Sequence, residues 1–161
     1  MSSVGQASGL SRPSLDVTDE RLVAHALAVA SIFGTLRAIV GQLSGMLILL
    51  QARLARDPGD LPDIRMLRER RDEAVERIAH LNPPLGRTAD RSRLQEVVVH
   101  LDAAISTIEQ IRRACSNEHI DGASARLIFA YRLMQSICDH RIGLTMVDTS
   151  HACCTCGKKL V

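Results

Sequence analysis

One stripe of apolar residues constrains this chain more than any other feature of its sequence. Between Leu22 and Leu54, apolar residues recur in alternating steps of four and three positions. This heptad pattern is typical of a long helix that packs against near-parallel or antiparallel neighbours. The stripe consists of Leu22, Ala26, Val29, Phe33, Leu36, Val40, Leu43, Leu47, Leu50 and Leu54. The DPGD stretch that follows ends the helix, so roughly 37 residues at ~1.5 Å each predict a helix ~55 Å long.

Three further segments have helical periodicity. The second, 63–81, has a highly charged outer face, and NPPLG ends it. The third begins near Thr88 or Asp90, and the fourth covers roughly 123–141 after an SNEHIDG connection. The predicted inner positions of the second segment are Ile64, Leu67, Val75, Ile78 and Leu81. Those of the third segment are Leu94, Val98, Leu101, Ile105, Ile108 and Cys115, and those of the fourth are Leu127, Ala130, Met134, Ile137 and Cys138. Because no strand pattern is present, the sequence predicts an all-α, antiparallel bundle of about four helices.

Length and composition support one soluble domain. The 161 residues suffice for an apolar core, and with Phe33, Phe129 and Tyr131 as the only aromatic residues that core must consist mainly of aliphatic side chains. We expect a flexible N-terminal arm over 1–17, the bundle over 18–143 and an irregular Cys/His-rich tail over 144–161. The arm has no basic and apolar leader pattern, which predicts a cytoplasmic protein. A net charge of +2, from 20 basic and 18 acidic residues, argues against nucleic acid as a partner.

Small residues interrupt the first helix at regular spacing. Gly34, Gly41 and Gly45 each cost ~1 kcal/mol relative to Ala inside a helix, and with Ala30 and Ala38 they form small-xxx-small spacings. Such spacings let a second helix approach closely, either within the bundle or between subunits, so a homo-oligomer or a helical protein partner is expected. Leu at position 41 or 45 should then overpack the contact, at a cost on the order of 1–3 kcal/mol. The apolar run 38–50 has only thirteen residues, which predicts no transmembrane span.

The histidines and helical cysteines give no pattern of a catalytic or metal site. No Glu stands three residues before a His, as a di-iron bundle requires, and the pair Glu96 and His100 is typical of a surface contact. Cys115 and Cys138 fall on apolar faces, where a thiol packs as a small hydrophobic group. There is neither a nucleophile elbow nor a Gly-rich phosphate loop, so no catalytic residue is assigned.

The last eleven residues, HACCTCGKKLV, concentrate the chemistry of the chain. His151, Cys153, Cys154 and Cys156 are four candidate metal ligands. The unit Cys-x-x-Cys-Gly-Lys resembles one knuckle of a zinc ribbon over about six residues, without a second knuckle. A C-x-x-C turn points two thiolates at one ion, and structural zinc requires four ligands, so two tails could share one site. The tail is therefore predicted to bind zinc or another thiophilic metal, and two or three thiolates would suffice for Cu(I).

Three functions are consistent with this organisation. The first is a non-enzymatic helical-bundle interaction or scaffold protein with a metal-binding tail. In the second, the protein is a precursor or carrier whose Cys-rich tail is the substrate of a modifying enzyme. The third is a thiol redox sensor in which Cys153 and Cys156 alternate between dithiol and disulfide.

Overall fold

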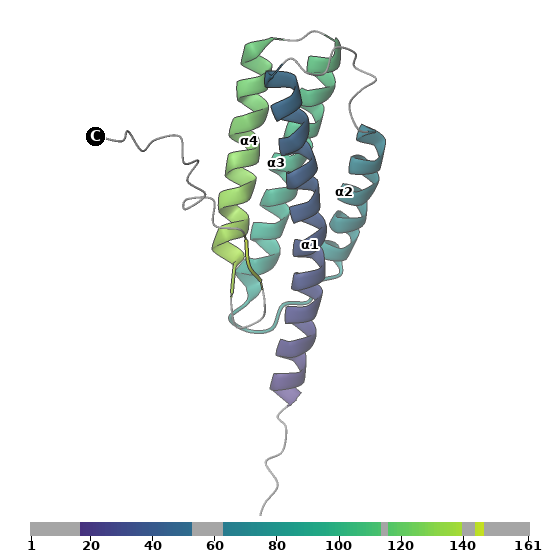
Figure 1. Cartoon of the computed structure of the whole chain (residues 1–161). Helices are drawn as coiled ribbons and strands as arrows, with labels where there is room; N and C mark the ends of the chain where they lie inside the picture. Colours follow the sequence, from purple (N-terminus) through teal and green to yellow (C-terminus); the bar gives the residue numbers. More distant parts are fainter. Residues whose placement is uncertain (1–16, 53–62, 114–115, 140–143, 147–161) are drawn as a thin grey trace, which may run out of the picture.

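The protein is a bundle of four helices with up-down-up-down topology. The computed structural model describes residues 17–52, 63–113, 116–139 and 144–146. The helices are α1 (Val17–Gln51), α2 (Ile64–Ala79), α3 (Thr88–Arg113) and α4 (Asn117–Ile137). Consecutive helices run in opposite directions (Figure 1). Apart from one isolated antiparallel bridge, the described residues contain no β-structure, and the predicted all-α fold class is confirmed.

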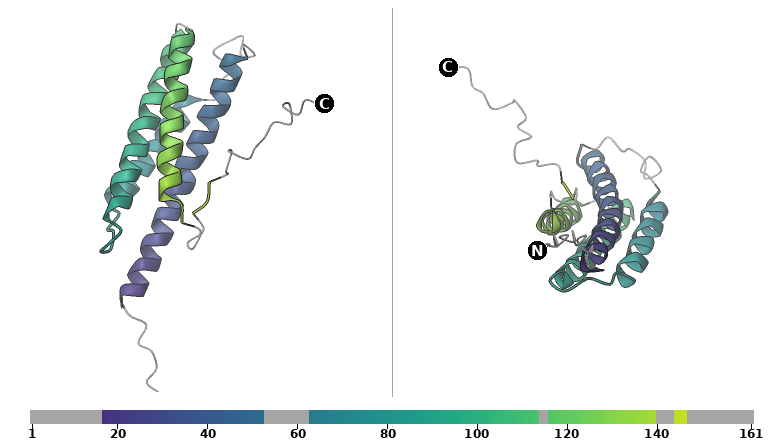
Figure 2. Two further views of the ribbon diagram at one scale, coloured as in Figure 1. Left: turned by 90° about the vertical axis from the view of Figure 1, so that its left-hand side faces the viewer. Right: turned by 90° about the horizontal axis from the view of Figure 1, so that it is seen from below.

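Helix α1 is the longest element, as predicted, and contacts all three other helices. Viewed along the bundle, it lies between α2 and α4 with α3 behind it (Figure 2). Phe33, Leu36 and Leu43 from the predicted stripe are buried, but so are Ile32 and Ile39 beside the stripe. The buried arc is wider than the heptad pattern predicted because three neighbours, rather than one, cover this helix.

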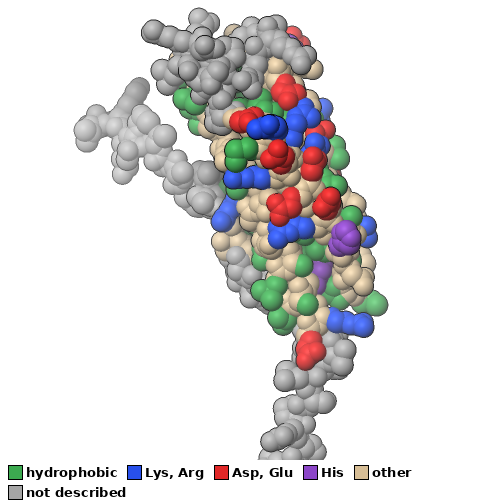
Figure 3. Space-filling model, turned by 90° about the vertical axis from the view of Figure 1, so that its right-hand side faces the viewer, with side chains coloured by type: hydrophobic (Ala, Val, Ile, Leu, Met, Phe, Trp, Pro, Cys, Tyr) green, Lys and Arg blue, Asp and Glu red, His purple; other side chains and the backbone are tan. Residues whose placement is uncertain are grey.

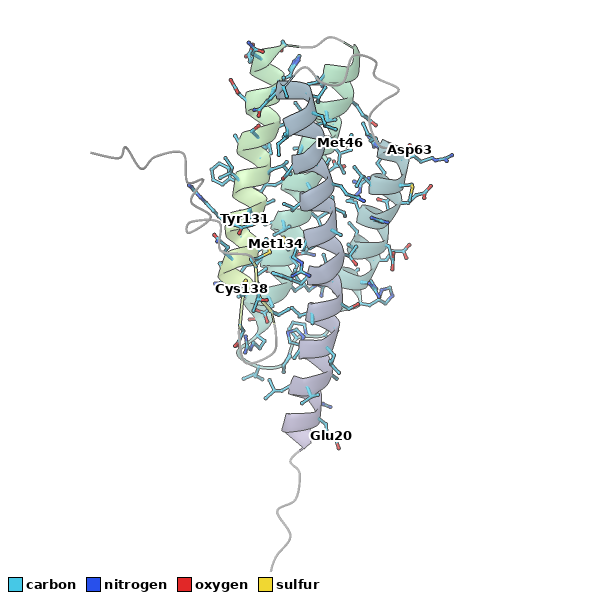
Figure 4. The ribbon with its side chains drawn as sticks, viewed as in Figure 1. Glu20, Met46, Asp63, Tyr131, Met134 and Cys138 are labelled. Atoms are coloured by element: carbon cyan, nitrogen blue, oxygen red, sulfur yellow. The ribbon has the colours of Figure 1, made fainter. Side chains whose placement is uncertain are left out.

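The N-terminal end of α1 projects beyond the other helices. Figure 4 shows Glu20 at this projecting end, well past the end of α4 marked by Cys138. Leu22, which begins the predicted stripe, is 37% exposed here, and Val23 is 59% exposed. The prediction that Leu22 belongs to the core is wrong, because the projecting turns have few neighbours to cover them.

Helix α2 begins at a well-formed cap, and its predicted inner positions Ile64, Leu67, Ile78 and Leu81 are buried; only Val75 departs from the prediction. The Asp63 side chain accepts a hydrogen bond from the backbone N–H of Arg65 at 2.9 Å, which satisfies one of the free donors at the helix start. Val75 is 42% exposed, whereas Ala74 is completely buried. The prediction for Val75 is therefore wrong: small Ala74 lies at the contact with the bundle.

Gly86 has φ +84° in the connection to α3, a left-handed conformation that suits glycine.

Helices α3 and α4 form the most extensive helix pair. Their predicted inner positions from Leu94 to Ile108 and from Leu127 to Ile137 are buried, and Cys138 is half-buried. Helix α4 begins at Asn117 rather than at Ala123, so the predicted SNEHIDG connection is wrong. The Ser116 side chain caps the helix by accepting a hydrogen bond from the backbone N–H of His119 at 3.2 Å. With this cap in place, the helix begins six residues earlier than predicted and includes Gly122.

The chain after α4 turns back against the bundle. Asp139 and Leu144 exchange two backbone hydrogen bonds of 3.1 Å, and Leu144 is buried in the core. Met146 packs against the same core, and Arg37 of α1 donates a hydrogen bond to the Thr145 carbonyl oxygen at 3.3 Å. Residues 144–146, which were assigned to the tail, therefore pack on α1.

Candidate functional site

The predicted metal ligands His151, Cys153, Cys154 and Cys156 lie outside the described residues, as do Cys115 and all of the predicted arm (1–17) except Val17, which begins α1. Within the described ranges, no group of three or more His, Cys, Asp or Glu side chains is placed to hold a metal ion. Cys138 donates a hydrogen bond from Sγ to the Met134 carbonyl oxygen at 3.4 Å, which agrees with the packing role expected of it.

His100 contacts an aromatic ring rather than a metal. Its imidazole stacks on Phe129 with ring centroids 5.5 Å apart and an interplanar angle of 14°. Glu96, four residues earlier, is exposed. Among the described residues, Glu96 and His100 have no third side chain of metal-ligand type beside them, and their surface contact stays a prediction.

The first notable surface is the side of α1 that faces away from the core. We define the outer stripe as Leu27, Ser31, Gly34, Ala38, Gly41, Gly45 and Ile48, which recur in steps of three and four and lie opposite the buried arc. Leu27 is 67% exposed and Ile48 is 62% exposed. Arg37 is the only Asp, Glu, Lys or Arg between Arg21 and Gln51, and it lies beside the stripe rather than in it. At ~1.5 Å per residue, the outer stripe is ~32 Å long.

Among the described residues, nothing lies close to the position that a side chain on the outer-stripe glycines would take. A Cβ atom built on Gly34, Gly41 or Gly45 would meet no heavy atom within 4 Å among the described residues. Close helix approach inside the bundle, one of the two expected explanations for these glycines, is therefore wrong.

A hollow lies where the outer stripe meets α2. Its volume is about 460 Å³, and it is lined by Ser31, Gly34, Thr35, Ala38, Arg70 and Glu73. Small side chains on α1 form its floor, and the guanidinium of Arg70 and the carboxylate of Glu73 stand beside it. Figure 3 shows the neighbouring α2 face, where acidic and basic side chains alternate. The floor of this hollow thus consists of small residues, two of which, Ser31 and Thr35, carry hydroxyl groups, and its rim is charged.

The α2 charges are held by ion pairs with α3. Arg68 donates two hydrogen bonds to the Glu109 carboxylate, at 3.0 and 2.6 Å, and Arg71 pairs with Asp102 at 2.5 Å. The hydrogen bond with Glu109 is the main reason that the pKa of Arg68 is raised. These pairs connect α2 to α3, whereas Arg70 of α2 donates a hydrogen bond to Gln42 Oε1 of α1 at 3.2 Å.

The second notable surface is a pocket at the projecting end of α1, which we call the N-terminal pocket. Its volume is about 380 Å³. It is lined by Leu22, Val23, His25, Ala26, Leu27 and Val29 of α1 together with Arg87, Asp90 and Asp139. The α1 residues supply a mostly apolar wall, and the other three supply charged groups.

A buried polar pair lies at the base of the N-terminal pocket. His25 Nε2 is 3.2 Å from Asp90 Oδ2, and the two side chains are only 5% and 12% exposed. Arg87 lies between two carboxylates, with NH2 3.0 Å from Asp139 Oδ2 and NH1 4.0 Å from Asp90 Oδ2. The cluster joins α1, the start of α3 and the chain after α4. Position 25 falls on the same helical face as Leu22 and Val29. A histidine within this apolar face was the only feature of the sequence that could have pointed to the cluster.

Helix α1 also meets a membrane criterion. The segment Glu20–Gln51 is long and apolar enough to cross a bilayer by length and composition, and 39% of its most apolar window is buried inside the bundle. A buried core helix satisfies the same criterion, so this observation does not separate a membrane segment from a core helix with a second apolar face.

Comparison of the chain with protein-family models, curated proteins and solved structures finds no significant match. Its function must therefore be argued from its own residues.

Proposed function

We propose that this protein is a non-enzymatic helical interaction protein that self-associates through the outer stripe of α1. The observation that carries the proposal is that α1 packs its inner face against all three other helices and also has an outer stripe without a charged residue, whose glycines no other described residue approaches closely. Surface helices normally place charged side chains opposite the core. A second copy would cover the apolar ends of the stripe, Leu27 and Ile48, and would approach closely over its glycines.

The two faces of α1 favour a second copy of the chain over a lipid bilayer as the occupant. The inner face already packs against α2, α3 and α4, so insertion into a bilayer would require the bundle to open. A two-fold dimer requires no such rearrangement, because the same stripe on both copies forms a self-complementary contact. Small side chains bury little area, so we expect a weak dimer that forms at high protein concentration.

Analytical ultracentrifugation over a concentration series tests self-association. Gly41→Arg places a long, charged side chain in the centre of the outer stripe and should leave only monomer. Ala79→Arg, at an exposed position on α2, adds the same charge elsewhere and should leave the dimer intact. A wild-type protein that stays monomeric at every concentration, or a dimer that Gly41→Arg does not weaken, would contradict the proposal.

Flotation with phosphatidylcholine vesicles tests the membrane alternative. The wild-type protein should remain with the soluble fraction. Flotation of the wild-type protein with the vesicles, lost in Gly41→Arg and kept in Ala79→Arg, would replace self-association by a membrane contact of the same stripe.

We further propose that the C-terminal tail binds zinc or another thiophilic metal. The sequence observation that supports it is the Cys153-x-x-Cys156-Gly157 unit with His151 and Cys154 beside it. Because one tail supplies only one knuckle, we expect about one zinc ion per two chains, shared between the tails of a dimer. Thiolate ligands require release of protons, so the affinity should fall as the pH is lowered.

Cobalt titration of the fully reduced protein tests the metal proposal. Cobalt-thiolate absorption should appear in the wild-type protein and be lost in Cys153→Ser and in Cys156→Ser. Cys138→Ala, in the packed part of the bundle, should leave the absorption unchanged. Absence of the absorption in the wild-type protein would overturn the metal site. The intact mass of native protein then separates the alternatives, because a modified tail has a permanent mass change and a redox sensor loses two hydrogens.

A further inference from the structure

The chain after α4 places the start of the C-terminal tail beside the outer stripe. Leu144 is only 3% exposed, and Met146 packs against the same core. The guanidinium of Arg37 donates a hydrogen bond to the Thr145 carbonyl oxygen at 3.3 Å. Because Arg37 lies beside the outer stripe, these contacts hold residues 144–146, from which the tail continues, at the flank of the surface through which self-association is proposed.

This flank position is at the middle of the outer stripe. Arg37 is ten positions after Leu27 and eleven before Ile48. When the same stripe on two copies forms a two-fold contact centred on it, its middle meets the middle of the partner's stripe in both a parallel and an antiparallel pair. A tail that began at one end of the stripe would be ~30 Å from its equivalent in an antiparallel pair. The two tails therefore begin at the same level in either arrangement.

The length of the tail is sufficient for its cysteines to meet those of a second copy. A helix with its side chains is ~10–12 Å across, so two α1 helices side by side place the two tail starts within roughly 25 Å of each other. Seven residues lead from Met146 to Cys153, and seven residues span at most ~25 Å when fully extended. Each tail has to cover only about half of the separation.

The ligand set of one tail is incomplete without a second tail. Cys153 and Cys156 form one C-x-x-C unit, which supplies two thiolates, whereas structural zinc takes four ligands. A second copy can supply the missing ligands, and the outer stripe is the surface that would bring the second copy to this place.

From these observations we propose that zinc regulates self-association: an ion held by the tails of two copies strengthens the contact between their outer stripes. This inference rests on the proposed self-association through the same stripe. The coupling is reciprocal, so self-association strengthens zinc binding by the same factor. Each thiol releases its proton to the solvent when it binds zinc, and the effect of zinc on the dimer should therefore fade as the pH is lowered.

Sedimentation of the full-length, reduced and metal-free protein, with and without added zinc, tests the coupling. Zinc should lower the dissociation constant of the wild-type dimer about tenfold or more. It should do the same in Cys138→Ala, whereas Cys153→Ser should keep the metal-free dimer and show no response to zinc. A dimer whose dissociation constant is unchanged by bound zinc, or a protein that binds no zinc, would overturn the proposal.

The reciprocal measurement is the zinc affinity, obtained by competition with a chromophoric chelator. Gly41→Arg should bind zinc about tenfold or more weakly than the wild-type protein, and the control Ala79→Arg should bind it equally well. Equal zinc affinities in Gly41→Arg and the wild-type protein would show that the stripe does not bring the tails together, and would contradict the proposal. A metal-free dimer that ignores zinc contradicts the coupling alone, whereas a protein that is monomeric with and without zinc contradicts self-association as well.

An insertion tests whether the place where the tail starts matters. About twenty Gly and Ser residues inserted after Met146 leave every ligand intact and lengthen the connection to Cys153 from seven residues to about twenty-seven. The effective concentration of one tail at the other falls roughly as the −3/2 power of this length, so the effect of zinc on the dimer should decrease roughly sevenfold. The same insertion after Val161 should leave the effect unchanged. An undiminished effect after the first insertion would overturn the role of the position at the middle of the stripe.

Discussion

The inner and outer faces of α1 have the same helical backbone and nearly the same absence of charge, yet they differ in side-chain size. The inner face consists of large side chains such as Leu36, Ile39 and Leu43, all fully buried. The outer stripe consists mainly of Gly, Ala and Ser, and a Cβ added to its glycines would meet no heavy atom within 4 Å among the described residues. Large side chains gain by filling a core, whereas small ones gain only where another backbone comes close. The difference shows that the inner face holds the monomer together, and it is the basis on which we propose self-association through the outer stripe.

The largest expected effect comes from truncation of the inner face. Leu36→Ala should lower the free energy of unfolding by about 2–5 kcal/mol, because it removes buried methyl groups and leaves a cavity among three helices. Ile48→Ala in the outer stripe should change it by about 0.5 kcal/mol or less at concentrations where the protein is monomeric. Urea denaturation measures both. Equal losses in the two variants would contradict the assignment of the two faces.

The next effect concerns the hydrogen bond between His25, on the inner face of α1, and Asp90 of α3. Asp90→Ala should cost about 1–3 kcal/mol, because it leaves the buried His25 ring nitrogen without its hydrogen-bond partner. Glu76→Ala, at an exposed position of α2, should cost about 0.5 kcal/mol or less and serves as the control. Chemical denaturation of the two variants in parallel gives the comparison, and a cost for Asp90→Ala no larger than the control would show that the pair contributes little.

A glycine variant in the outer stripe should increase the stability of the monomer, whereas the variants above decrease it. Gly41→Ala should stabilise the monomer by up to ~1 kcal/mol, because Ala loses less backbone entropy in a helix and Cβ meets no neighbour. Gly41→Leu should be tolerated in the monomer and should weaken the dimer by overpacking. Thermal melting at low concentration measures the first effect, and sedimentation at high concentration measures the second. Destabilisation of the monomer by Gly41→Ala would place an intrachain neighbour on the stripe after all.

The smallest expected effect is at the α2–α3 ion pair. Glu109→Gln should cost about 0.5 kcal/mol, less at high salt, because Arg68 and Glu109 are about a third exposed and solvent screens them. Since the hydrogen bond raises the pKa of Arg68 above its value in the unfolded chain, its contribution is complete below the unfolded pKa and declines only as the pH rises through the folded pKa. From about pH 6 to about pH 10 the contribution of Arg68 should therefore be constant. Denaturation at several pH values and two salt concentrations measures both dependences.

Local sequence patterns determined much of this fold. Apolar periodicity predicted four helices, the length of α1 and most of the core of α3 and α4, because each pattern depends only on the 3.6-residue repeat. The same local reasoning failed at Val75 and at the start of α4. Val75 is the larger apolar residue, but its neighbour Ala74 is the one that packs against the bundle. At Asn117, the Ser116 cap starts the helix within the segment that had been predicted as a connection.

The tertiary structure alone decided which surfaces of α1 are free and which distant residues meet. Gly34, Gly41 and Gly45 indicate close packing in the sequence, but only the arrangement of α2, α3 and α4 on the opposite face leaves them uncovered. The N-terminal pocket brings together His25, Arg87, Asp90 and Asp139 from three separated segments. No periodicity links such positions, because their contact depends on where the projecting end of α1 meets the start of α3. The metal ligands proposed for the tail, in contrast, are neighbours along the chain, and that candidate site depends on the sequence alone.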